Sequence, residues 1–397
     1  MSWQKIPFNS LFKEPSRNGI YKTAEFHGRG VKIVNMGELF SNDRISNQKM
    51  ERVEISESEK RTVLLQEGDL LFARRSLVES GAGKVAIVDN LIEDTTFESS
   101  VIRIRLDKEK CLPLFYLYWF KSYNGRSVIY PLITGVNVKG IRGSELANVE
   151  VDFPPITTQK RVVDVLSAYD SLIENNHKQI RLLEEAAQRL YKEWFVDLRF
   201  PGYENSIFEN DIPCGWEFKK FSDLAEIVMG TSPKSEFYNT NHEGIPFHQG
   251  VGSYGKRFVN DDVYTTVAIK TATANSILIS VRAPVGRVNI TRNRIAIGRG
   301  LAAINCKNNC QNFLYYLIKA FFFKDDIVGN GSIFSSISKQ ELCDLKFLVP
   351  EERLIRQFNE KVKSIDNKID ILDKQILLLK EARDRLLPKL MNGEIEL

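Results

Sequence analysis

Histidine, cysteine and acidic side chains are the residues that could support catalysis or metal binding in this chain. The four histidines show no metal-ligand spacing with one another or with cysteine: His27, His177, His242 and His248. Cys306 and Cys310 lie close together in the sequence but supply only two possible ligands, whereas a structural zinc site takes four. The sequence therefore predicts no metal site.

Two further segments look like cofactor or catalytic motifs but lack the residues that the chemistry needs. Gly81-Ala82-Gly83-Lys84 is similar to a phosphate loop, yet valines stand where the first glycine and the magnesium-binding Ser or Thr should be. The segment 152–156 (DFPPI) resembles the Asn/Asp-Pro-Pro-aromatic motif of amino-methyltransferases, but it has an extra residue and ends on an isoleucine that cannot stack on a base. We therefore expect a non-catalytic chain that binds no cofactor of its own.

Length and composition are those of an ordinary globular protein. The chain has 397 residues, 43% of them hydrophobic, which is enough for two or three domains. Five scattered cysteines and a start without a signal-peptide pattern favour a cytoplasmic location, and the longest apolar run, 313–323, is too short to span a membrane. A net charge of +4 does not by itself indicate nucleic-acid binding.

The most informative feature is an internal duplication. Residues 135–190 align with residues 331–386 without a gap at an offset of 196, and sixteen pairs are identical. Those pairs begin at Gly135/Gly331, Ile141/Ile337, Glu145/Glu341, Leu146/Leu342, Pro154/Pro350, Asp170/Asp366, Ile173/Ile369 and Lys178/Lys374, and continue with Gln179/Gln375, Ile180/Ile376, Leu182/Leu378, Leu183/Leu379, Glu185/Glu381, Ala186/Ala382, Arg189/Arg385 and Leu190/Leu386.

The duplication predicts four segments in the order domain, helix, domain, helix. We place a first globular domain at 1–153, a helical spacer at 154–200, a second domain at 201–349 and a second spacer at 350–397. Apolar runs predict strands at 69–74 and 83–88 in the first domain and at 276–281 and 286–290 in the second, and each domain then has an aromatic-rich helix, at 113–121 and 311–322. The expected fold class is α/β (α+β), with a pseudo-two-fold repeat.

Both spacers carry a heptad seam, from Val162 to Trp194 and from Phe358 to Leu390. One seam alone could equally be a helix packed on its own domain, but two copies in one register favour an antiparallel helix pair. The predicted interface residues are Leu166, Ile173, Ile180, Leu183, Leu190, Val362, Ile369, Ile376, Leu379 and Leu386. The seams differ at Asn176/Leu372 and Ala187/Arg383, and Pro201-Gly202 and Pro388 are predicted to mark the helix ends.

Basic and polar residues at strand ends and in the loop before each spacer are the candidates for DNA contact. Arginine can read guanine, and lysine beside a glycine turn suits a phosphate. The candidates are Arg74, Arg75, Lys84, Asn137 and Lys139 in the first half and Arg282, Arg287, Ser335 and Ser336 in the second. Each could equally be a solvated strand-end residue, but similar chemistry recurs in both halves.

The pattern resembles the specificity subunits of type I restriction-modification enzymes over essentially the whole chain. The most specific segments are the strand-to-helix junctions at 146–161 and 342–357, the helix end at 193–197 (EWFVD), and the strands at 69–74 and 277–288. The second junction has Pro350-Glu351 where the first has Pro154-Pro155.

The resemblance implies two target-recognition domains that each read one half of a bipartite, asymmetric double-stranded DNA target. It also implies helices that hold two methyltransferase (M) subunits, with restriction/translocase (R) subunits joining for cleavage. S-adenosylmethionine, ATP and Mg²⁺ would belong to those partners, not to this chain. The alternative is a coiled-coil scaffold whose globular domains bind a ligand that is not nucleic acid.

Overall fold

The computed structural model describes residues 3–322 and 336–395. Its contacts divide the chain into two compact units, Met1–Asn175 with Gln375–Leu397, and Asn176–Lys374. Each unit combines one globular domain with parts of both long helices. The sequence-based partition treats domains and helices as separate segments, whereas the contacts group each domain with the helix segments on which it packs.

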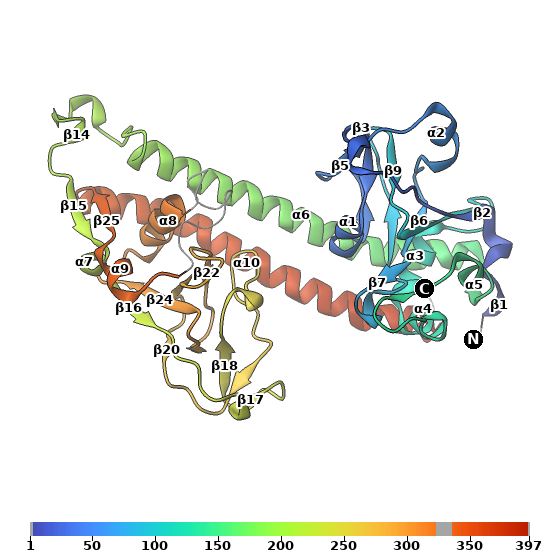
Figure 1. Cartoon of the computed structure of the whole chain (residues 1–397). Helices are drawn as coiled ribbons and strands as arrows, with labels where there is room; N and C mark the ends of the chain where they lie inside the picture. The colour runs from blue at the N-terminus through green and yellow to red at the C-terminus, as the bar shows by residue number, and fades with distance from the viewer. Residues whose placement is uncertain (1–2, 323–335, 396–397) are drawn as a thin grey trace. The chain divides into compact units, whose positions relative to one another are not determined.

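The first domain contains a five-stranded sheet, ordered β2-β10-β6-β8-β4, and a three-stranded sheet, ordered β5-β3-β9 (Figure 1). All four side chains of β6 are buried, and they alternate between two cores because neighbouring strand residues point to opposite faces. Helix α3 supplies buried aromatic side chains to one of these cores. The bounds are β1 (Gln4–Pro7), β2 (Phe12–Asn18), β3 (His27–Val34), α1 (Met36–Ser41), β4 (Arg44–Ile45), β5 (Glu51–Val53), α2 (Glu57–Val63), β6 (Leu70–Ala73), β7 (Arg75–Ser76), β8 (Val85–Val88), β9 (Thr95–Phe97), β10 (Val101–Leu106), α3 (Pro113–Lys121), α4 (Tyr123–Ile129), β11 (Lys139–Gly140), α5 (Gly143–Ala147) and β12 (Glu150–Phe153).

The second domain repeats this plan with a four-stranded sheet, β16-β24-β21-β22, and a five-stranded one, β17-β19-β18-β23-β20. Strand β21 is again buried, with side chains alternating between two cores, and the aromatic helix α8 covers one of them. The bounds are β13 (Phe208–Glu209), β14 (Ile212–Pro213), β15 (Glu217–Lys220), α7 (Phe221–Leu224), β16 (Ala225–Met229), β17 (Tyr238–Asn239), β18 (Ile245–His248), β19 (Tyr264–Thr265), β20 (Thr271–Ala272), β21 (Ile277–Ser280), β22 (Val288–Ile290), β23 (Ile295–Ile297), β24 (Leu301–Cys306), α8 (Gln311–Phe322), α9 (Lys339–Asp344) and β25 (Lys346–Val349). The predicted mixed α/β character of both domains is confirmed.

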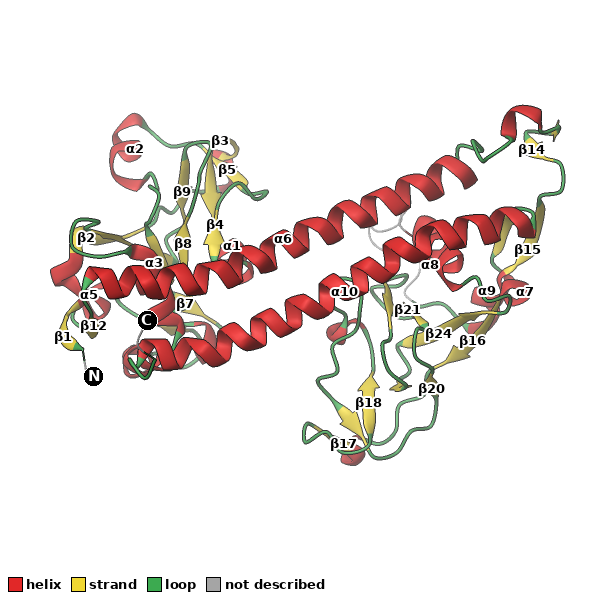
Figure 2. Ribbon diagram, turned by 180° about the vertical axis from the view of Figure 1, so that it is seen from behind, coloured by secondary structure: helices red, strands yellow, loops and turns green. Residues whose placement is uncertain are grey.

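Two helices of 40 residues each follow the domains, α6 (Ile156–Phe195) and α10 (Glu352–Met391) (Figure 2). Helix α6 begins directly after the proline pair, and the carbonyl of Pro155 accepts the N–H of Gln159 at 3.0 Å. The prediction that Pro388 marks a helix end is wrong, because α10 continues to Met391. The Pro388 carbonyl accepts the N–H of Asn392 at 2.9 Å, so the last turn closes around the proline.

Within each unit the two helices pack antiparallel, as predicted. In the first unit Val162 and Leu166, near the start of α6, share a core with Leu390 and Met391, at the end of α10. In the second unit the end of α6 packs in the same core as the start of α10, through Ala187, Tyr191 and Trp194 with Leu354, Phe358 and Val362. Apolar residues at every third or fourth position give each helix one continuous apolar face, and the two faces pack against each other.

The predicted interface residues divide into two groups by burial. Buried are Leu166, Ile173, Ile180, Val362, Ile369 and Ile376, and half-buried are Leu183, Leu190, Leu379 and Leu386. Of the two breaks in the seam, Asn176 is buried, and Arg383 donates to the Asp170 carboxylate at 2.7 Å.

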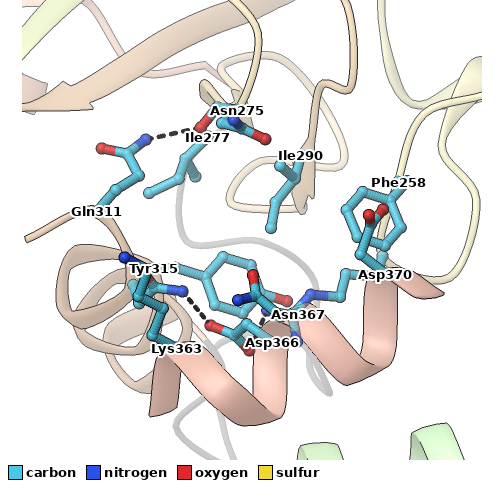
Figure 3. Close-up of a pocket in the computed structure, with 12 residues that line it drawn as sticks. Phe258, Asn275, Ile277, Ile290, Gln311, Tyr315, Lys363, Asp366, Asn367 and Asp370 are labelled. Atoms are coloured by element: carbon cyan, nitrogen blue, oxygen red, sulfur yellow. Dashed lines mark hydrogen bonds and ion pairs between the residues drawn. The ribbon is translucent and has the colours of Figure 1, made fainter. Parts of the chain in front are cut away.

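One buried carboxylate ties the second domain to its helices (Figure 3). Asp366 of α10 accepts hydrogen bonds from Arg257 at 2.5 Å, from Asn312 at 2.5 Å and from the hydroxyl of Tyr316 at 2.7 Å. Arg257 is only 4% exposed. Burial lowers the Arg257 pKa, but electrostatic interactions with Tyr315 and Asp366 outweigh it and hold the pKa above its ordinary value. Arg257, Tyr316 and Asp366 therefore form one hydrogen-bonded cluster.

Asp170, which aligns with Asp366 at the offset of 196, has the same role in the first unit. Its carboxylate accepts the hydroxyl of Tyr118 at 2.6 Å and Arg383 at 2.7 Å. Burial raises the pKa of Tyr118, so its hydroxyl stays protonated and donates. In both units a tyrosine of the aromatic helix and an arginine thus meet one aspartate of a long helix.

We expect Leu166→Ala to lower the free energy of unfolding by about 2–5 kcal/mol, because Leu166 is fully buried and the substitution leaves a cavity between the helices. Leu182→Ala on the same helix is the control. Leu182 is 51% exposed, so its loss should change stability by less than about 0.5 kcal/mol. Denaturant unfolding of both variants measures the difference, and equal losses would contradict the pairing.

Arg257→Ala should destabilise the second unit by about 3–5 kcal/mol, because it leaves Asp366 buried without its charged partner. Arg356→Ala, which removes an exposed arginine paired with Glu352, should leave unfolding unchanged. Thermal unfolding of the two variants provides the comparison. A stable Arg257→Ala protein would show that this carboxylate does not anchor the domain.

Candidate nucleic-acid interface

The two domains share one backbone frame at the end of a central strand. In the first, the N–H of Ala73 donates to the Lys84 carbonyl at 2.8 Å, and the N–H of Gly83 donates to the Ala73 carbonyl at 2.8 Å. In the second, Ser280 donates to Arg287 and Gly286 donates to Ser280, both at 2.9 Å. Lys84 and Arg287 are therefore equivalent positions.

The glycine before each of these basic residues is required by the frame. Gly83 and Gly286 have φ values of 69° and 84°, in the left-handed region that favours glycine. A Cβ atom would also lie 2.4 Å from Ile129 at the first glycine and 2.6 Å from Phe322 at the second. The Gly-Lys and Gly-Arg pairs are thus turn features, which explains why they recur in both halves.

The segment before α5 in the first domain, and the segment before α9 in the second, also return to the strand end. The N–H of Ile141 donates to the Arg74 carbonyl, and that of Ile337 donates to the Val281 carbonyl, both at 3.0 Å. Gly140 pairs with Arg75 on β7, and Ser336 forms an isolated bridge with Arg282. Ser335 lies outside the described residues.

These bonds align Arg75, not Arg74, with Arg282. Arg74 corresponds to Val281, which is buried in the second core, and the Arg74 guanidinium donates to the Ser99 carbonyl at 3.2 Å. Arg75 and Arg282 are both exposed. The sequence alone left Arg74 and Arg75 together because the strand-end register depends on hydrogen bonds to segments far along the chain.

Four of the five residues predicted in the first domain lie together in the structure. The fifth, Lys84, makes a contact inside the domain. Arg75, Asn137 and Lys139 lie on β7 and on the loop paired with it, beside Arg74. Lys84 is half-buried, and its ammonium donates to the Phe40 carbonyl at 2.5 Å. Because the Lys84 ammonium is already engaged by this carbonyl, the predicted phosphate contact would have to compete with that hydrogen bond.

The first platform, defined as residues 74–84 and 134–142, is strongly basic. It contains five arginines and lysines and one acidic residue, Glu79. Arg126 of α4 donates to the carbonyls of Ser80 and Ala82, which fixes the loop between the two basic ends. The platform is therefore rigid and positively charged before any ligand binds.

In the second domain two neighbouring cavities, of about 250 and 480 Å³, share Val251 in their walls. Arg282 and Arg299 line the smaller cavity, and Arg287 lines the larger one with two lysines, Lys256 and Lys319. Among the described residues that line these two cavities there is no aspartate or glutamate. We call this surface the second platform.

Sequence reasoning missed three members of the second platform, Lys256, Lys319 and Arg299. Lys256 and Lys319 come from a loop and from α8, far from the strand end in sequence, and carry no signal that could have identified them. Arg299 stands between two glycines after β23, a pattern that could have suggested a close approach to a ligand.

A buried histidine fixes the loop that carries Lys256. The two ring nitrogens of His248 lie 2.7 Å from the Ser253 hydroxyl and 3.0 Å from the Asp261 carboxylate. His248 is only 1% exposed. Its hydrogen bond is the main cause that lowers the pKa of Asp261. These contacts join both ends of the loop and keep its basic residue in place.

In residues 3–322 and 336–395, no cluster of three or more His, Cys, Asp or Glu side chains could hold a metal ion. All five cysteines are free. No helix in this part of the chain is both long and apolar enough to cross a membrane.

Comparison with known proteins places this architecture in a family. The family described as "Type I restriction modification DNA specificity domain" matches residues 2–185 and 213–381. The specificity subunit assigned to the type I restriction enzyme MjaX of Methanocaldococcus jannaschii is 31% identical over 96% of this chain and 91% of that relative. The MjaIX specificity subunit of the same organism is 27% identical over 94% of this chain and 89% of its own length.

Among solved structures, the type I restriction-modification S subunit from M. genitalium has the same fold, with a TM-score of 0.58 at 18% identity. The match covers 98% of this chain and 96% of that one. The two family matches and the 31% identical relative that spans nearly the whole length show that this chain belongs to the family of type I restriction-modification DNA specificity subunits.

Proposed function

We propose that this chain reads a bipartite, asymmetric DNA target, one half with each domain, as the non-catalytic subunit of a type I restriction-modification complex. The observation that carries the proposal is that one backbone frame occurs twice with different side chains on it. Equal frames place readout residues in equivalent positions. Different side chains then select different bases, so the two half-sites differ.

The chemistry of the two platforms suits DNA. Exposed arginines such as Arg75 and Arg282 can form paired hydrogen bonds with guanine, and lysines such as Lys139 and Lys256 neutralise phosphates. The large positive excess on the first platform supports the same reading, because phosphate contacts supply much of the affinity of DNA-binding proteins.

The exposed faces of the long helices support docking of two methyltransferase subunits. The most similar part of the duplication includes five identical, exposed pairs: Lys178/Lys374, Leu182/Leu378, Glu185/Glu381, Ala186/Ala382 and Arg189/Arg385. Leu182 and Leu378 are 51% and 65% exposed. Packing between the helices does not require identity at exposed positions. Two identical surfaces instead suit two copies of one partner.

Catalytic groups and cofactors would come from the partners in this proposal. The methyltransferase subunits would bind S-adenosylmethionine, and the restriction/translocase subunits would use ATP and Mg²⁺. We place the assembly in the cytoplasm, where its DNA target is accessible.

Arg75→Ala and Arg282→Ala should each weaken binding to the target by about 1–3 kcal/mol if these arginines read bases. Neither should change unfolding, since both side chains are exposed. Fluorescence anisotropy of the complex with duplex DNA at several salt concentrations measures the effect. Arg356→Ala, an exposed arginine of α10, is the charge-matched control.

Affinity that is unchanged in both platform variants would contradict their role in readout. DNA binding that does not depend on salt, in a complex that still assembles, would favour the scaffold alternative.

Leu182→Asp and Leu378→Asp should each reduce the number of bound methyltransferase subunits from two to one, and the double variant should bind none. A charge at an exposed position leaves the helix intact but cannot be buried against a partner. Analytical ultracentrifugation of the purified complexes measures the stoichiometry. Two bound subunits in the double variant would exclude this surface as the docking site.

A further inference from the structure

The first platform carries a closed hairpin loop, residues 134–140. Thr134 and Gly140 exchange two backbone hydrogen bonds, of 2.9 and 2.8 Å. Gly135 has a φ of 103°, and a Cβ atom there would lie 2.1 Å from the Val138 carbonyl oxygen. The loop is thus fixed by its own backbone and by the pairing of Lys139 with Ser76.

Aliphatic side chains project from this loop and from the segment beside it. Val136 is 90% exposed and Val138 is 48% exposed. Leu77 and Val78, which follow the strand paired with the loop, are 84% and 60% exposed. Aliphatic side chains that are this exposed gain little from folding, and four of them on two paired segments indicate a binding site.

The surroundings of these aliphatic groups fit DNA. Arg75, Lys139 and Arg142 lie on the same two segments, and the one acidic residue there is Glu79. Such a surface attracts a polyanion. Between the two valines stands Asn137, also exposed, whose amide has the donor and acceptor needed to bind adenine at N6 and N7.

In B-DNA the thymine 5-methyl group is the apolar feature of the major groove, and it belongs to the base pair in which adenine offers N6 and N7. An asparagine flanked by valines therefore matches both halves of one A·T pair. We propose that the hairpin 134–140 reads an A·T base pair in the first half-site, with Asn137 bound to the adenine and Val136 packed against the thymine methyl group. This inference rests on the proposed function, because it requires that the first domain contacts DNA.

The test uses the complete complex with methyltransferase subunits and a duplex whose target has been defined by methylation mapping. Each thymine of the first half-site is replaced in turn by deoxyuridine, which lacks only the methyl group. For the wild-type chain we expect about a fourfold loss of affinity at one position, as for one buried methyl group. Val136→Ala should bind more weakly and should no longer distinguish thymine from uracil at that position.

Asn137→Ala should lose discrimination at the adenine paired with that thymine, by roughly tenfold. Ile92→Ala is the matched control, because Ile92 is a 75% exposed aliphatic residue of the same domain on another loop. This control should keep the sensitivity to uracil and the discrimination at adenine.

Target-specific binding by wild type that is insensitive to uracil at every thymine would overturn the inference while leaving the proposed function intact. So would a Val136→Ala variant that keeps the wild-type sensitivity. Failure of the wild-type complex to bind any methylated target in preference to other DNA would overturn both.

Discussion

One aspartate attaches each domain to a long helix, and the position of each platform depends on it. Asp366 is buried and Asp170 is half-buried. Asp170 and Asp366 accept hydrogen bonds from a tyrosine of the aromatic helix and from an arginine. A buried carboxylate is costly unless its oxygens are satisfied, and hydrogen bonds satisfy it only in particular directions. The bonds therefore fix the orientation of the aromatic helix on the long helix, and the sheet packed on the aromatic helix follows.

In each platform, the groups that hold the fold are backbone groups, whereas the basic side chains are exposed. The bonds that shape the strand end join backbone groups, such as Gly83 to Ala73 and Gly286 to Ser280, and they need a particular side chain only at the glycine. Arg75, Arg282 and their neighbours are exposed and are free to differ without affecting the fold. The side chains of a platform can therefore differ between the two halves while the backbone frame stays the same, which is consistent with the divergence of the two halves.

In the long helices, packing constrains the side chains of the buried face and leaves those of the exposed face unconstrained. Their buried seam must stay apolar, and it admits breaks only where a partner satisfies them, as Asp170 does for Arg383. Their exposed face has no such requirement, yet five of its residues recur identically in the two helices. A shared partner surface gives a physical reason for that identity, whereas helix packing does not.

The sequence by itself determined the duplication, the two mixed α/β domains, the seam of each helix and the absence of recognisable catalytic motifs, because periodicity and repetition are properties of local order along the chain. Tertiary structure decided which residues meet. Arg75 aligns with Arg282, Lys84 turns to the Phe40 carbonyl, α10 continues through Pro388, and Arg257 is buried on Asp366. Each of these depends on a hydrogen bond to a partner, often far along the chain, that no local pattern encodes, and the same is true of the lysines that complete the second platform.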